Sequence, residues 1–117
     1  MRRPGEVLES LERVIASRKG GDSDRSYTSR LLAGGTETIG SKVTEEAIEL
    51  VHAAVGETDD RVVSEAADLV YHTLVLLAAR NVPLARVEDE LARRFGVSGL
   101  DEKASRSGGT SREGETR

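Results

Sequence analysis

The stretch from residue 60 to residue 80 constrains the fold most, because it is apolar on almost every side of a helix. A helix on the surface of a globular domain shows one apolar stripe and one polar face, so a helix of this kind belongs in the centre of a bundle or at a subunit interface. The chain has 117 residues, enough for one domain with one modest core. These observations predict an all-α fold that is built around this segment.

Helical periodicity also extends over the residues before this stretch. Residues 6–19 have apolar side chains at spacings of three and four, which predicts an amphipathic helix. Ser26 or Thr28 can cap a short helix that the glycines at 34 and 35 stop. A longer helix should then run from a cap at Thr36 to about Gly56. Its expected core stripe is Ile39, Val43, Ala47, Leu50 and Ala54.

Helix signals continue after this segment. Thr58 or Asp59 can cap the apolar helix, and Pro83 can open another helix that ends at Phe95 before Gly96. Ser98 can cap one more turn through Ala104. Residues 105–117 contain no hydrophobic side chain and are expected to be a disordered polar tail. The predicted folding unit is therefore residues 1–104.

Composition excludes several classes of function. Aromatic residues make up 3% of the chain, which argues against a β-sandwich and against base stacking on single-stranded nucleic acid. The absence of cysteine excludes disulfides and thiolate chemistry. A net charge of -4 gives no general attraction to nucleic acid or to an anionic membrane. No apolar run approaches the roughly 18 residues of a membrane span, and no secretory signal begins the chain, so we expect a cytoplasmic protein.

The negative charge is concentrated in the middle of the chain. Residues 36–80 carry nine acidic and three basic side chains, a net charge of -6, although they are also the most apolar part. Within the helix expected at 36–56, one strip holds Lys42, Glu45, Glu46 and Glu49, because a helix turns 100° per residue. In the apolar helix, a second strip holds Arg61, Glu65, Asp68 and His72.

The two strips can meet, because consecutive helices that are joined by a short turn pack antiparallel. Glu46, Glu49, Glu65 and Asp68 would then form a group of four carboxylates. Their repulsion in a partly dry groove would be severe, and a divalent cation relieves it. Mg²⁺ is the natural candidate, since it takes carboxylates together with waters and substrate phosphates.

A simpler interpretation stays open for each of these residues. The acidic strips can be solvated faces that are supported by the pairs Lys42–Glu46 and Arg61–Glu65. His72 can be a satisfied core residue with a hydrogen bond to Asp68. His52 is then structural or exposed, and Tyr71 belongs to the core or to an interface. Ser26 and Thr28 are first of all capping residues, and a phosphate at that helix N-terminus is the sharper alternative.

Five segments of the chain follow a recognisable pattern: residues 42–49 (KVTEEAIE), residues 65–72 (EAADLVYH), the Ser26-Tyr27-Thr28 segment, and the helices at 7–19 and 87–94. Through these segments, residues 6–95 resemble the phosphoribosyl-ATP pyrophosphohydrolase family. The E-x-x-E and E-x-x-D pairs alone are shared with the wider MazG-like superfamily of all-α nucleotide pyrophosphohydrolases. Thr38 and Ser41 stand where the family often has basic residues, and Arg25 and Thr44 where it often has glycine.

The resemblance implies a MazG-like bundle of four to five helices with a core completed by dimerisation. It implies Mg²⁺-assisted hydrolysis of phosphoribosyl-ATP to phosphoribosyl-AMP and pyrophosphate, the second step of histidine biosynthesis, with Mn²⁺ as a possible substitute. Glu46, Glu49, Glu65 and Asp68 would hold the metal, and Glu45 or Glu46 would activate the attacking water. The substrate-binding candidates are Lys42, Arg30, Tyr27, Arg61 and His72.

Two other functions compete with this expectation. A MazG-like house-cleaning enzyme would hydrolyse a standard or damaged nucleoside triphosphate with the same carboxylates. A non-catalytic helical dimer, acting as an adaptor, would carry the acidic strips only as solvated faces.

Overall fold

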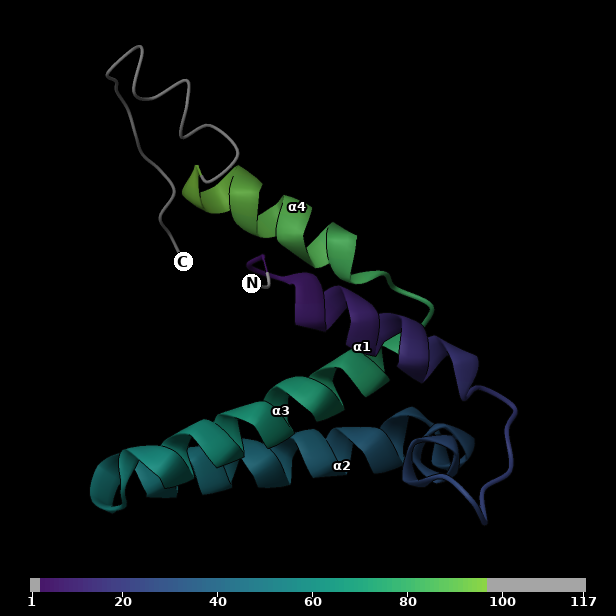
Figure 1. Cartoon of the computed structure of the whole chain (residues 1–117), viewed down its shortest axis with the longest axis horizontal. Helices are drawn as coiled ribbons and strands as arrows, with labels where there is room; N and C mark the ends of the chain where they lie inside the picture. Colours follow the sequence, from purple (N-terminus) through teal and green to yellow (C-terminus); the bar gives the residue numbers. More distant parts are fainter. Residues whose placement is uncertain (1–2, 97–117) are drawn as a thin grey trace. The chain divides into compact units, whose positions relative to one another are not determined.

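The computed structural model describes residues 3–96, and every element in that range is an α-helix (Figure 1). The helices are α1 (Glu6–Ser17), α2 (Tyr27–Gly56), α3 (Asp59–Ala79) and α4 (Leu84–Phe95). The prediction of an all-α fold is confirmed. The turn expected after Ser98 and the tail expected at 105–117 lie outside the described residues.

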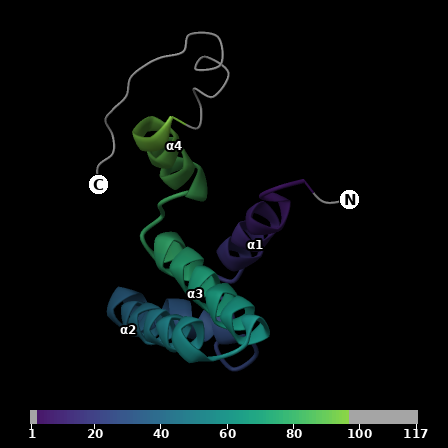
Figure 2. The ribbon, with the colours of Figure 1, turned by 90° about the vertical axis from the view of Figure 1, so that its left-hand side faces the viewer.

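Helices α2 and α3 form an antiparallel hairpin that carries most of the buried core (Figures 1 and 2). The turn between them is short, since α2 ends at Gly56 and α3 begins at Asp59. The hydroxyl of Thr58 caps α3 by accepting a hydrogen bond from the backbone N–H of Arg61 at 3.3 Å. The apolar side chains buried in the described chain are Ile15, Leu31, Ile39, Ala53, Leu74 and Val75. Among them, Ile15 comes from α1, which packs on α3.

The core stripe of α2 differs from the expected one at its C-terminal end. Ala53 is fully buried, whereas Ala54, which was expected in the core, is exposed. Counted at 100° per residue, Ala53 returns to within about 40° of Ile39 on one side, and Ala54 lies about 60° away on the other. The contact with α3 lies on the side of Ala53, so the prediction for Ala54 is wrong.

Gly35 interrupts α2. Its backbone has φ 88° and ψ 173°, a conformation that only glycine adopts readily, and the helical path is kinked there. The expected break at Gly34 and Gly35 is therefore confirmed, and residues 27–34 form a separate first segment of α2. Ser26, rather than Thr28, caps this segment, since its hydroxyl accepts a hydrogen bond from the backbone N–H of Ser29 at 3.1 Å.

Helix α3 has the length and the apolar composition of a membrane span, with a mean hydropathy of 1.5 over an 18-residue window. The expectation that no apolar run approaches that length does not hold by this measure. A core helix of a soluble protein meets the same criteria, and α3 packs against both α1 and α2.

The chain divides after Val82 into two compact units, and α4 is the described helix of the second. Pro83 precedes its first residue, and Gly96 ends it in the left-handed conformation with φ 74°, as the sequence predicts. On this helix the Glu90 carboxylate accepts hydrogen bonds from Nε of Arg93 at 3.1 Å and from Nε of Arg94 at 2.8 Å.

Candidate metal centre

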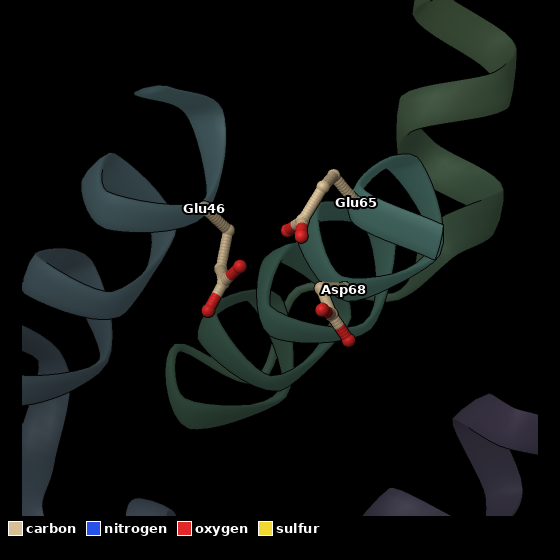
Figure 3. Close-up of side chains that lie close together, drawn as sticks. All are labelled: Glu46, Glu65 and Asp68. Atoms are coloured by element: carbon tan, nitrogen blue, oxygen red, sulfur yellow. The ribbon is translucent and has the colours of Figure 1, made fainter. Parts of the chain in front are cut away.

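Three carboxylates from two helices meet on the facing sides of the α2–α3 hairpin. Glu46 projects from α2, and Glu65 and Asp68 project from successive turns of α3 (Figure 3). One oxygen from each of the three lies within 4.8 Å of the others. This spacing suits a single cation that is coordinated by all three side chains.

The cluster lies between the protein interior and solvent. Glu65 keeps only 7% of its surface exposed, the side chain of Glu46 keeps 13%, and Asp68 is exposed. A cation bound here would therefore have buried ligands on one side and an open side for water or a substrate.

The electrostatics of Glu46 indicate an uncompensated negative site. Burial raises the pKa of the Glu46 carboxyl above its usual value, and the neighbouring charges of Asp68 and Glu65 raise it further. His72 and Lys42 oppose this rise without cancelling it. Crowded, partly desolvated oxygen ligands are what a divalent cation such as Mg²⁺ stabilises, so these residues fit a metal ion.

The ion pairs of the simpler interpretation also form. Arg61 donates a hydrogen bond to Oε2 of Glu65 at 2.6 Å and another from its Nε to Glu57 at 3.1 Å. These partners, with the bond to Glu57 as the main cause, raise the pKa of Arg61. Lys42 Nζ lies 3.9 Å from Glu46 Oε2. The ion pairs Lys42–Glu46 and Arg61–Glu65 each lie within one helix and support it. The oxygens of Glu46, Glu65 and Asp68 nevertheless lie within 4.8 Å of one another.

Two predicted acidic residues lie outside the cluster. Glu45 is exposed and accepts a hydrogen bond from Lys42 Nζ at 3.2 Å, which is the main reason that the pKa of Lys42 is raised. Glu49 is exposed, one turn beyond Glu46 on α2. Of the four carboxylates that were expected to meet, the structure thus brings together Glu46, Glu65 and Asp68.

His72 is buried with 5% of its surface exposed, and both of its ring nitrogens are engaged. Nδ1 lies 2.8 Å from the main-chain carbonyl oxygen of Asp68, and Nε2 lies 3.0 Å from the hydroxyl of Tyr27. The expected hydrogen bond to Asp68 therefore exists, but it uses the backbone and leaves the Asp68 carboxylate free to join the cluster. His52 is exposed, one of the two options left open for it.

An aromatic group adjoins His72 and includes contacts that sequence reasoning missed. Tyr27 and Tyr71 stack with ring centroids 6.3 Å apart, and the Tyr71 hydroxyl forms a hydrogen bond with Thr28. The guanidinium of Arg30 lies 5.5 Å from the centroid of the Tyr27 ring, and the same side chain donates to the carbonyl of Ser23 at 3.1 Å. The sequence signal was the presence of hydroxyl and aromatic residues side by side in both segments, at 27–28 and at 71–72.

The family model and the related proteins that match this chain carry equivalent descriptions. A family model described as phosphoribosyl-ATP pyrophosphohydrolase matches residues 8–95. A protein of Trichlorobacter lovleyi named phosphoribosyl-ATP pyrophosphatase is 54% identical over 86% of this chain and 93% of its own length. Proteins of the same name from Paramagnetospirillum magneticum and Dinoroseobacter shibae are 52% and 54% identical, over 92% and 86% of this chain and 98% of their own length in both cases.

Proposed function

The chain belongs to the phosphoribosyl-ATP pyrophosphohydrolase family, and from that membership we propose that it hydrolyses phosphoribosyl-ATP to phosphoribosyl-AMP and pyrophosphate. This reaction is the second step of L-histidine biosynthesis. We expect it to take place in the cytoplasm, where nucleotide-derived intermediates are made and consumed.

The observation that carries the proposal within the structure is the cluster of Glu46, Glu65 and Asp68. Hydrolysis of a phosphoanhydride places negative charge on the phosphorus oxygens, and a negatively charged chain needs a cation to approach such a substrate. The raised pKa of Glu46 supports a cation at this position, because the carboxylates repel one another without it.

We assign the metal-binding role to these three residues, and Glu49 is the fourth candidate, since it lies one helical turn from Glu46. Mg²⁺, or Mn²⁺ in its place, would neutralise the polyphosphate and stabilise the charge that develops on the phosphorus oxygens. The open side at Asp68 leaves room for the substrate and for the attacking water.

We propose the remaining roles from the chemistry of the side chains and from the resemblance to the family. Glu45 or Glu46 would orient or deprotonate the attacking water. Lys42, Arg30 and Arg61 supply positive charge for the phosphate groups. Tyr27 keeps 43% of its surface exposed beside Arg30, which suits a ring that packs against the nucleotide or the ribose.

The direct test is pyrophosphate release from phosphoribosyl-ATP in the presence of Mg²⁺. Asp68→Asn and Glu49→Gln should each lower turnover by about a hundredfold or more. Residues that only support a metal ligand already lower activity by up to about a hundredfold when they are replaced, so loss of a ligand should cost at least as much. Asp89→Asn, an exposed change of the same chemistry on α4, is the matched control and should keep full activity. No turnover by a correctly folded wild-type protein would overturn the proposal, and full activity in both variants would overturn the metal assignment.

Two further measurements separate the competing functions. Preference for a nucleoside triphosphate in a substrate panel would identify a house-cleaning enzyme of the MazG-like superfamily. For a non-catalytic adaptor, calorimetry with Mg²⁺ or Mn²⁺ should show only the weak binding of a solvated acidic face.

We also propose that the protein is a homodimer. Ile48, Val51 and Val55 lie on one face of α2, opposite the side that carries Ile39 and Glu46, and all three are exposed. Val55 leaves 83% of its surface exposed. An apolar stripe of this kind marks an interaction surface, and a second copy of the chain is the partner that family membership favours.

A further inference from the structure

The first segment of α2, residues 27–34, depends on side-chain contacts for its direction relative to α3. Gly35 separates it from the rest of α2 with a non-helical backbone conformation, at which the helix kinks. Its direction is therefore set by the contacts of its side chains. Ser29 donates to the carbonyl of Arg18 and Leu31 is buried, while Tyr27 and Thr28 form hydrogen bonds with His72 and Tyr71 of α3.

The hydrogen bonds of His72 have a defined direction. A main-chain carbonyl can only accept, so Nδ1 carries the proton in the bond to Asp68. In the neutral imidazole, Nε2 is then an acceptor, and the Tyr27 hydroxyl donates to it. His72 thus joins the turn of α3 that bears Asp68 to the first residue of α2.

Tyr27 carries this connection to the cationic side chains. Its ring holds the guanidinium of Arg30, and its phenol lies near enough to Lys42 to add to the rise in the pKa of that lysine, which the hydrogen bond with Glu45 dominates. Tyr27 therefore connects two cations: Arg30, which lies against its ring, and Lys42, whose Nζ lies 3.9 Å from Oε2 of Glu46 in the cluster.

We propose that His72 is a positioning residue, which does not touch the substrate but fixes Tyr27, and through it Arg30, beside the carboxylate cluster for binding the phosphate groups of the substrate. The inference rests on the proposed function for the identity of that substrate. It assigns His72 a different task from direct substrate binding, because the side chain is buried and both nitrogens are already used within the chain.

A positioning role of this kind predicts a particular kinetic effect. Arg30 would contact phosphate groups in the bound substrate and in the transition state alike, so its displacement should raise KM with little change in kcat. Loss of a metal-binding carboxylate should instead lower kcat. A merely structural histidine would lower the amount of folded enzyme without changing KM.

The test compares three substitutions that remove different parts of the connection. Tyr27→Phe removes the donor, His72→Asn keeps a donor near the position of Nδ1, and His72→Gln places an amide oxygen near the position of Nε2. We expect Tyr27→Phe and His72→Asn each to raise KM about tenfold, the effect of roughly one lost hydrogen bond, with kcat within about twofold of wild type. The double variant should be no worse than either single one, and His72→Gln should recover part of the affinity.

Nitrogen NMR of the metal-free protein supplies a second readout that is independent of turnover. At a pH where the imidazole is neutral, wild-type His72 should show a protonated Nδ1 and a bare Nε2, and Tyr27→Phe should shift the Nε2 resonance. A proton on Nε2 instead, an unchanged KM in Tyr27→Phe, or additive losses in the double variant would overturn the inference. Absence of turnover by the wild-type protein would overturn the proposed function and the substrate role of His72 with it, whereas the failures just named leave the proposed function intact.

Discussion

Glu46 on α2 and Asp68 on α3 bring carboxylate oxygens within 4.8 Å of each other across an antiparallel helix pair. Neither helix places them together by itself, and their mutual repulsion, with the burial of Glu46, opposes folding of the metal-free chain. The site is therefore a local cost to stability that a bound cation would offset.

Removing one of these charges should stabilise the metal-free protein. We expect Asp68→Asn to raise the melting temperature in the presence of a chelator, because the charge next to Glu46 disappears. The same variant should lose most of the stabilisation that Mg²⁺ confers on the wild type, since binding to the folded state is weakened. Thermal unfolding with chelator and with Mg²⁺ checks both effects. Asp89→Asn should change neither, and an equal Mg²⁺ effect in wild type and Asp68→Asn would contradict the prediction.

The stability of the metal-free protein should also depend on pH through Glu46. The pKa of this carboxyl is raised in the folded state above its ordinary value of 4.5, chiefly by burial. The folded state thus binds the proton more tightly, and this contribution to stability is present below pH 4.5 and is lost as the pH rises through the folded pKa. Denaturant unfolding at a series of pH values, with chelator, should show a weaker fall in Glu46→Gln than in wild type. Identical pH profiles would show that Glu46 is not the titrating group.

Gly35 should tolerate no side chain. An alanine at φ 88° and ψ 173° is strained by about 1–3 kcal/mol, so Gly35→Ala should lower the free energy of unfolding by that amount. Because the change also disturbs the kink, the first segment of α2 should lose its fixed contact with His72. Gly40→Ala is the matched control, since Gly40 has ordinary helical geometry and open space around it and should gain up to about 1 kcal/mol. Denaturant titration measures the free energy of unfolding of both variants. An equal change in the two variants would contradict the role of the kink at Gly35.

The exposed stripe on α2 should control the oligomeric state. Val55→Asp places a charge at a position that is 83% exposed, so it should leave the isolated chain folded while it converts the proposed dimer to a monomer. Val55→Thr keeps the shape of the side chain without a charge and should remain largely dimeric. Sedimentation or light scattering measures the state. A dimer that survives Val55→Asp unchanged would place the interface elsewhere.

On α4, Glu90 should remain ionised in unusually acidic solution. Hydrogen bonds from Arg93, then from Arg94, lower its pKa from 4.5 to about 2. The contribution of this carboxylate to stability is therefore present above pH 4.5 and is lost as the pH falls through about 2. Carbon NMR of the Glu90 carboxyl measures the pKa directly. Arg93→Gln should return it toward 4.5, Arg86→Gln should not, and a pKa near 4.5 in wild type would show that these hydrogen bonds do not persist in solution.

The sequence predicted the helices and most of their ends, because local signals decide them. Ser26, Thr58, Pro83 and Gly96 act within one turn of their own positions. The error at Ala54 came from a different source: two adjacent alanines are equally apolar, and only the partner helix decides which of them is buried.

The sequence predicted that acidic strips form the candidate site, but it did not predict which carboxylates of those strips come together. The spacing of Glu65 and Asp68 places both on one face of a helix, so the sequence by itself determined that two acidic strips exist. Which carboxylates meet was decided by the packing of α2 on α3, which brings Glu46 into the cluster and leaves Glu49 exposed. The bond from Tyr27 to His72 likewise spans 45 residues. Periodicity describes the face of one helix, whereas the contact between two faces depends on the register and angle at which the helices pack, which only the tertiary structure decided.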